Sequence, residues 1–244
     1  MALYRYVKAT KSKKMFRSFA VSFLLMGTGG LLVLWVAWPI ISFSLFSEGF
    51  LSKTVSPVSD VSTQVKAPQA FSPVAFAADS ASTVGVVDYT NPNVWFPTSP
   101  QKKVVAPVNS YTLSIPSLRI KNAQVVIGGD DLSKSLIHYG GTSLPGEFGN
   151  AVIFGHSTLP QLYNPSNYKT IFSELPSMKP GDTFTIFYDG ISYTYTVFDL
   201  VVVDPTDLSV LEQKYDDSYV TLVTCVPPGT YWKRLNVHAR LKRV

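Results

Sequence analysis

The sequence predicts a mainly β domain, closed into a small barrel, that follows one N-terminal membrane anchor and a linker. Three observations support this fold class. Seven short strand patterns separated by turn residues fill residues 108–244, residues 18–47 contain no charged side chain, and residues 48–107 show no sustained periodicity. Many short strands with turn residues between them are typical of closed barrels and sandwiches.

The N-terminus has the pattern of an uncleaved membrane anchor. Residues 1–17 carry six Lys and Arg side chains and no acid, and residues 18–47 are rich in Phe, Leu, Val, Ile and Trp. A transmembrane helix needs about 20 apolar residues. The positive-inside rule then predicts a single-pass protein with its basic tail in the cytoplasm and its C-terminal domain outside the cell. Trp35 and Trp38 fall near the outer boundary of this helix.

A cleaved signal peptide is the competing interpretation of this end of the chain. The apolar region of such a peptide usually has about 7–15 residues. The nearest small-x-small cleavage pattern, Ala75-Phe-Ala77, lies far beyond the apolar stretch. We therefore favour the anchor.

The anchor also explains the basic composition. The whole chain has a net charge of +5 and a pI of about 9.1. Without the six cations of the tail, 15 cations face 16 acidic side chains, a net charge of −1. The high pI is thus a topology signal and gives no reason to expect a nucleic-acid partner.

Residues 48–107 are rich in Ser, Thr, Val, Ala and Pro and are predicted to be a flexible linker. A flexible chain of this length spans on the order of 40 Å. Residues 88–97 within it are more aromatic than a solvated linker requires, since they include Trp95 and Phe96. Two interpretations remain open for this segment: packing against the flank of the domain, or a lid over an active groove.

The expected elements of the domain follow from β-branched and aromatic runs bounded by turn residues. Asp189-Gly190 is a hairpin turn signal between two of the strands. The predicted strands are Tyr111–Ile115, Gln124–Ile127, Asn150–Gly155, Thr183–Tyr188, Ser192–Val203, Tyr219–Thr224 and Leu235–Leu241, and the predicted short helices are Asp131–Leu136, Tyr168–Leu175 and Leu208–Lys214.

Cys225, the only cysteine, follows a predicted strand and precedes a Pro-Pro-Gly turn. Nine residues later, Arg234 begins the next strand, so a short loop can bring the thiol and the guanidinium together at one end of a sheet. A free thiol has a pKa of about 8.5 and needs a neighbouring cation or imidazole to become a nucleophile. His156 ends another apolar strand and is the best candidate imidazole. His238 has polar neighbours on its strand face and is predicted to be solvated.

These residues resemble the sortases, the cysteine transpeptidases of bacterial surfaces. The resemblance covers roughly residues 108–244. It rests on Thr-Leu-Val-Thr-Cys225 with Arg234 in Lys-Arg-Leu-Asn-Val, on the segment from His138 to His156, and on Leu113-Ser-Ile-Pro-Ser-Leu-Arg-Ile. The resemblance implies an eight-stranded sortase barrel, with Cys225, His156 and Arg234 as catalytic residues and His138 outside the catalytic set.

The implied function is a transpeptidase that cleaves an LPxTG-like sorting signal through a thioacyl enzyme. The implied partners are sorting-signal peptides, membrane lipid around the anchor, and an amine from a cell-wall precursor or a pilin lysine. No cofactor is expected: some sortases use calcium, but their acidic ligands find no match in this chain, and no Cys and His residues have metal-ligand spacing.

Two alternatives belong to other classes of function. One is another cell-wall cysteine transpeptidase or hydrolase, for which we expect a Ser-His-Gly-Cys-x-Arg run or a cysteine that precedes its histidine; here His156 precedes Cys225 and no such run occurs. The other is a non-catalytic anchored peptide-binding barrel, which the presence of all three reactive side chains disfavours. The class within the sortase family stays open.

Overall fold

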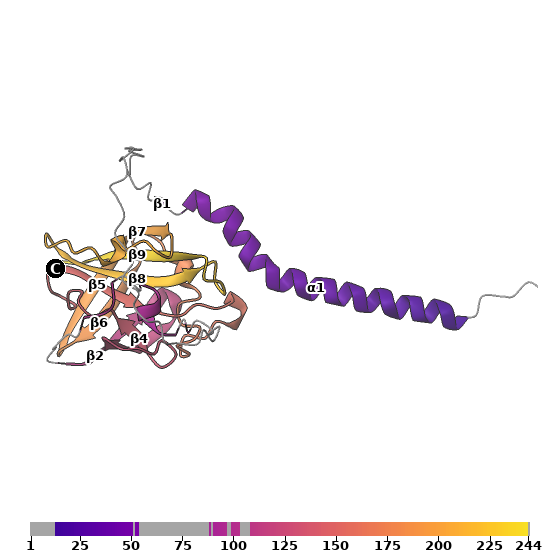
Figure 1. Ribbon diagram of the computed structural model, residues 1–244, viewed down its shortest axis with the longest axis horizontal. Helices are drawn as coiled ribbons and strands as arrows, with labels where there is room; N and C mark the ends of the chain where they lie inside the picture. The colour runs from indigo at the N-terminus through magenta and orange to yellow at the C-terminus, as the bar shows by residue number, and fades with distance from the viewer. Residues whose placement is uncertain are drawn as a thin grey trace, which may run out of the picture.

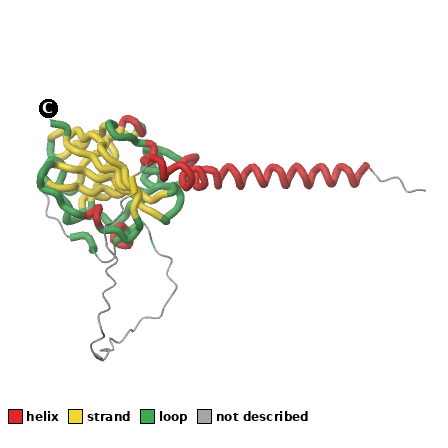
Figure 2. Tube along the Cα trace, turned by 90° about the horizontal axis from the view of Figure 1, so that it is seen from above, coloured by secondary structure: helices red, strands yellow, loops and turns green. Residues whose placement is uncertain are grey.

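The computed structural model describes residues 13–50, 52–53, 88, 90–96, 99–102 and 108–243. The strands join in the order β1-β7-β6-β2-β3-β4-β5-β8-β9, and β7 also pairs with β9. This last pairing closes β2 to β9 into an eight-stranded barrel, seen as the yellow tubes of Figure 2. The predicted mainly β fold and the closed barrel are confirmed.

The strands of the barrel are β2 (Ser110–Ile115), β3 (Ile120–Ile127), β4 (Leu136–His138), β5 (Gly149–Phe154), β6 (Thr183–Tyr188), β7 (Ile191–Val203), β8 (Ser218–Val226) and β9 (Lys233–Leu241). Most neighbours are antiparallel, but β3 pairs with β4 and β5 pairs with β8 in parallel. All seven strands predicted from the sequence are present. β4 was missed, because three residues are too short to show a strand period.

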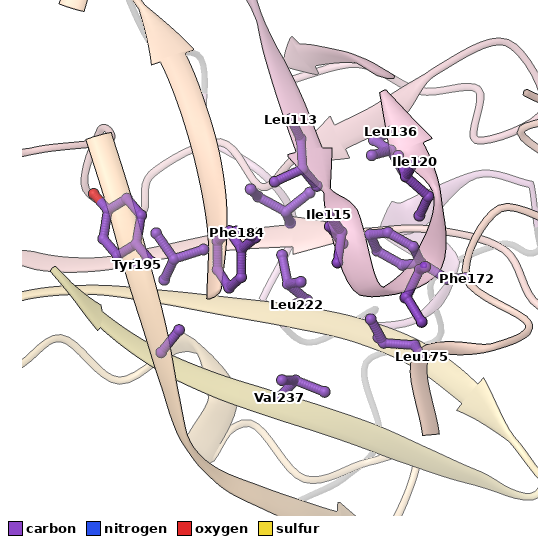
Figure 3. Packing of buried hydrophobic residues seen from close by; sticks show 14 of the residues in the cluster. Leu113, Ile115, Ile120, Leu136, Phe172, Leu175, Phe184, Tyr195, Leu222 and Val237 are labelled. Atoms are coloured by element: carbon purple, nitrogen blue, oxygen red, sulfur yellow. The ribbon is translucent and has the colours of Figure 1, made fainter. Parts of the chain in front are cut away.

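The barrel interior is filled by aliphatic and aromatic side chains from alternate positions of the strands. Figure 3 shows Leu113 and Ile115 of β2 packed against Phe184 of β6 and Leu222 of β8. On β8 the alternation sends Val220, Leu222 and Val226 inward and places Val223 and Cys225 on the outer face. The period of two along β8 therefore decides which side chains can form a site on the outside of the barrel.

The helical segments of the domain are single 3-10 turns. They are η1 (Pro92–Val94), η2 (Pro116–Leu118), η3 (Pro160–Leu162), η4 (Leu175–Ser177) and η5 (Ser209–Leu211). The prediction of helices at 131–136 and 168–175 was wrong. Asp131 Oδ1 accepts a hydrogen bond from the Ser133 backbone N–H at 2.9 Å, which forms a tight turn, and Leu136 already belongs to β4.

The N-terminal helix α1 (Lys13–Phe50) projects from one side of the barrel (Figure 1). Its segment Phe19–Leu45 is long and apolar enough to cross a membrane, with a mean hydropathy of 2.1. The short strand β1 (Ser52–Lys53) follows the helix at once and pairs in parallel with β7. This pairing ties the end of α1 to the barrel.

The described part of residues 88–102 lies against the barrel. Trp95 and Phe96 are buried and join a cluster on the outer face of β5 and β8. The segment is fixed by hydrogen bonds at both ends: the Leu132 backbone N–H donates to Thr90 O, and Gln101 Nε2 donates to Gly129 O. Of the predicted linker, residues 48–107, positions 51, 54–87, 89, 97–98 and 103–107 lie outside the described residues.

Candidate active site

Cys225 and Arg234 are paired residues on neighbouring strands. In the antiparallel register of β8 and β9, Cys225 lies opposite Arg234, and Val223 lies opposite Asn236. Since Val223 and Cys225 belong to the outer cluster, this row of side chains faces away from the barrel interior. The sequence had predicted that the loop between these strands would bring the thiol and the guanidinium together, and the register does so.

His156 follows β5, the parallel neighbour of β8 on its other side. Phe154 is paired with Val223, so two residues further along both chains His156 comes level with Cys225. The two segments stay together beyond the sheet, because the Ser157 hydroxyl donates to Cys225 O at 2.6 Å. All three predicted site residues therefore lie at the same end of adjacent strands.

Thr224 and Gly155 set the backbone that carries His156. The Thr224 hydroxyl donates to Gly155 O at 2.8 Å, so Thr224 points away from its neighbour Cys225 and supports the histidine segment. A Cβ atom on Gly155 would stand only 2.4 Å from Phe172 Cδ2 and 2.7 Å from Leu136 Cδ2. Only glycine fits this position, which lets the chain turn under Phe172.

The three side chains are covered in this structure. Cys225 is 1% exposed, Arg234 3% and His156 9%. The indole ring of Trp95 lies over the guanidinium, with its centroid 4.5 Å from Arg234 Cζ, and it contacts Phe154 edge to face at 5.3 Å. The segment that contains η1 thus separates the candidate site from solvent.

Burial controls the protonation of this closed site. It raises the pKa of Cys225 to about 11, and the positive charge of Arg234 offsets only part of the rise. Burial also lowers the pKa of His156, although the carboxylates of Asp131 and Asp88 oppose the change. At neutral pH the closed site therefore holds a neutral thiol and a neutral imidazole.

Two polar groups beside the thiol lack hydrogen-bond partners among the described residues. Arg234 Nη1 donates to Tyr231 O and Lys233 O at 3.3 Å each, but the buried Arg234 Nε has no acceptor. The buried Asn236 Oδ1, two residues along the same strand face, has no donor. Buried polar atoms are usually paired, so these two are available to a bound molecule.

Sequence reasoning did not assign a role to Asn236 or to Trp95. The alternation along β9 places Asn236 on the same face as Arg234, and this signal could have identified it. Trp95 stood out as an aromatic residue in a predicted linker, but its contact with Arg234 depends on the path of the chain across the barrel.

The remaining two histidines lie away from the thiol. His138 is fully buried, and its Nδ1 lies 2.8 Å from the Tyr111 hydroxyl, consistent with a structural role. His238 was predicted to be solvated, which is wrong: it is half-buried, its Nδ1 lies 3.0 Å from Thr221 Oγ1, and burial lowers its pKa. It lines a separate cavity of about 610 Å³ together with Phe198.

Within the described ranges no cluster of three His, Cys, Asp or Glu side chains could hold a metal ion.

Comparisons with known proteins find one family. The family model described as the sortase domain matches residues 113–242, which is more than half of the chain. Sortase D of Bacillus subtilis (strain 168) is 27% identical over 119 residues, which are 47% of this chain and 53% of that protein, so the chain spans about half the length of this relative.

Among solved structures, sortase C-1 from Actinomyces oris is 30% identical with a TM-score of 0.49, covering 57% of this chain and 76% of that one. A Clostridium perfringens sortase D5 transpeptidase is 24% identical with a TM-score of 0.48, covering 58% of this chain and 83% of that one.

Proposed function

The chain belongs to the sortase family, and we propose that it is a cysteine transpeptidase that cleaves an LPxTG-like sorting signal and transfers the new carboxyl end to an amine. The observation that carries the proposal is the pairing of Cys225 with Arg234 across β8 and β9, with His156 level with both at the end of β5. A thiol, an imidazole and a permanent cation at one end of a sheet are the groups that acyl transfer through a thioester requires.

In the first half of the reaction, His156 takes the thiol proton and Cys225 sulfur attacks the carbonyl carbon of the scissile peptide bond. The carbonyl electrons move to oxygen, and the guanidinium of Arg234 stabilises the oxyanion. When the tetrahedral intermediate collapses, the carbon–nitrogen bond breaks and His156 returns the proton to the departing amine. The product is a thioester on Cys225.

In the second half, an amine attacks the thioester carbon and His156 accepts its proton. The carbon–sulfur bond breaks, the new amide leaves, and the sulfur recovers a proton from His156. Sulfur is a better leaving group than an amide nitrogen, so one difficult exchange becomes two easier ones. The amine of a cell-wall precursor or a pilin lysine fits this role, because a primary amine is nucleophilic when unprotonated.

The covered site requires an opening step before substrate binds. Trp95 lies over Arg234, and Cys225 belongs to the same buried cluster as Trp95 and Phe96. We therefore assign the segment 88–96 as a lid. When it leaves, Arg234 Nε and Asn236 Oδ1, which have no partner among the described residues, are exposed as one donor and one acceptor two residues apart on a strand. An extended peptide repeats its backbone groups over the same interval of about 6.6 Å.

The apolar segment of α1 fits a single-pass anchor. With the basic tail in the cytoplasm, the barrel lies outside the cell, where its substrates are surface proteins and its second substrate belongs to the cell wall or to a pilus. The anchor itself contacts membrane lipid.

The test is mass spectrometry of the full chain in detergent, incubated with a panel of sorting-signal peptides and amines. We expect a thioacyl adduct on Cys225 with at least one peptide, and its release as a peptide–amine product when an amine is added. The Cys225→Ala variant gives neither. Cleavage that persists in this variant would refute the mechanism.

Burial of Cys225 favours one second candidate, a non-catalytic peptide-binding barrel, because a thiol that is 1% exposed is inert in the closed state. Peptide binding without any adduct, even after Trp95→Ala opens the site, would establish that candidate instead.

A further inference from the structure

Two loops at the catalytic end of the barrel expose large apolar side chains. Trp232, in the β8–β9 loop after Cys225, is 62% exposed, and Leu162, at the end of η3 after His156, is 60% exposed. The loops touch each other, because a Cβ atom on Gly229 would meet Leu159 Cδ2 at 3.1 Å. Exposed apolar patches mark interaction sites for proteins or membranes, and these two touching loops make the catalytic end a candidate for such a site.

The same loops contact α1. Gln161 Nε2, in η3, donates a hydrogen bond to Trp35 O at 3.0 Å. Phe43 of α1 packs against the barrel core. A cavity of about 620 Å³ between the helix and the barrel is lined by Pro39 and Phe43 on one side and by Pro160 and Pro228 on the other. The catalytic end therefore lies beside the part of α1 between Trp35 and Phe43.

The spacing of residues along the sequence predicts that the helix reaches the membrane surface at this part of α1. The last cation of the basic tail is Arg17. About 20 residues beyond it cross the hydrocarbon core, which brings the helix to the outer boundary near Trp35 and Trp38. Both indoles are more than half exposed on the helix, and indoles prefer the headgroup region. Gln161, bonded to Trp35, lies at the same level.

We propose that the catalytic end of the barrel rests on the outer leaflet of the bilayer, with Trp232 and Leu162 at the boundary between headgroups and acyl chains. The partner is the lipid interface of the membrane that the chain's own anchor spans. Trp232 suits this position because its ring is apolar and its N–H can donate to a headgroup. Cys225 then faces substrates that are themselves held in the membrane, so they reach the thiol by diffusing in two dimensions.

The contact is tested on the full chain in phosphatidylcholine vesicles with brominated acyl chains. Subtracting the fluorescence of the Trp232→Phe variant isolates the signal of Trp232. We expect this signal to be quenched by bromine and protected from acrylamide. As a matched control, Phe148→Trp in the Trp232→Phe background places an indole on a residue that is equally exposed, 60%, before β5 at the opposite end from His156. We expect the reverse pattern there.

A second measurement concerns activity and rests on the proposed function. Peptide substrate is supplied either free in solution or attached to a lipid in the same vesicles. We expect the Leu162→Ser/Trp232→Ser variant to lose about tenfold in kcat/KM on the lipid-attached peptide, because the local concentration advantage is lost, and to keep its activity on the free peptide.

The outcomes of these measurements distinguish the membrane contact from the proposed enzymatic function. Acrylamide quenching of Trp232 equal to that of the control would overturn the membrane contact, as would an equal loss on free and lipid-attached peptide. Protection of Trp232 that appears only in native membranes, and never in pure lipid, identifies a protein partner and also overturns it. Bromine quenching without turnover of either peptide supports the contact and rejects the enzymatic proposal alone.

Discussion

Arg234 is the group whose chemistry is hardest to replace, because it combines a permanent charge with a planar fork of five donors. Its Nη1 donates to the carbonyl oxygens of Tyr231 and Lys233, while its buried Nε has no acceptor among the described residues. The side chain therefore has donors available for an oxyanion once Trp95 has moved.

We predict that Arg234→Lys lowers kcat/KM by roughly a hundredfold, since removal of an oxyanion donor typically costs this much. Arg240→Lys is the matched control on the same strand: Arg240 is exposed and pairs with Asp217 at 2.6 Å. We expect its activity to stay within about twofold of the wild type. Steady-state kinetics with a cleavable fluorescent peptide measure both variants. Near-wild-type turnover of Arg234→Lys would remove this residue from the mechanism.

Asn236 is expected to contribute to activity while it lowers the stability of the fold. Among the described residues its buried Oδ1 has no donor, and such a group costs about 1–3 kcal/mol. We predict that Asn236→Leu raises the melting temperature of the chain and lowers kcat/KM. Thr221→Val is the matched control, because Thr221 is also buried on the outer face but donates to Asn150 Oδ1 at 2.8 Å. We expect it to lower the melting temperature. A lower melting temperature for Asn236→Leu would show that the amide supports the fold.

The element that decides reactivity is the lid segment, residues 88–96. It contacts the barrel through the hydrogen bond from the Leu132 N–H to Thr90 O near its start and through the buried side chains of Trp95 and Phe96 near its end, where the Trp95 ring lies over Arg234. The segment lies outside the barrel sheet, so its displacement leaves the strand pairing intact and requires less free energy than unfolding of the barrel.

We predict that Trp95→Ala increases the rate at which iodoacetamide modifies Cys225 at pH 8. Burial raises the pKa of Cys225 to about 11, and solvent admitted beside Arg234 lowers it, so the thiolate fraction grows. Val94→Ala is the matched control, since Val94 lies in the same segment and is exposed. Equal rates for wild type, Trp95→Ala and Val94→Ala would show that the segment does not govern access to the thiol.

At the scale of elements, the sequence predicted what depends on local pattern. Strands such as β6 and β7 alternate over six or more residues and end at turn residues, so their limits agree with prediction to within a residue. The helices predicted at 131–136 and 168–175 did not form, because Asp131 and Asn167 hydrogen-bond to nearby backbone N–H groups and hold turns.

In the candidate site, too, local sequence pattern predicts some features and not others. Cys225 and Arg234 lie opposite each other because the loop between their strands is short, and the length of this loop can be read from the sequence. His156 lies level with Cys225 because β5 pairs in parallel with β8, and these two strands are far apart in the chain. The resemblance supplied this partner, and local pattern alone could not. Trp95 covers Arg234 because its segment runs across the outer face of the barrel, and no local sequence pattern predicts this path.

For the molecule as a whole, a pH-sensitive contribution to folding comes from the barrel interior at His138, away from the reactive groups. Thr142 Oγ1 donates to Tyr139 O and so accepts from His138 Nε2, while Nδ1 accepts from the Tyr111 hydroxyl. The neutral imidazole has both nitrogens satisfied. A second proton would create a buried charge and disrupt the bond from Tyr111, which is why burial lowers the pKa of His138 to about 4.

This shift predicts an acid-sensitive fold. Between pH 6.5 and 4 the unfolded chain binds a proton at His138 that the folded chain does not, so stability is complete above pH 6.5 and falls as pH approaches 4, by about 3 kcal/mol in all. We expect His138→Gln, which keeps a polar side chain beside Tyr111, to start from a lower melting temperature but to lose less of it across this window. Calorimetric melts of both chains from pH 4 to 7 measure the difference. An identical slope would assign the acid sensitivity to other groups, such as His156 and His238, whose pKa values burial also lowers, or Asp217, whose pKa its hydrogen bonds lower.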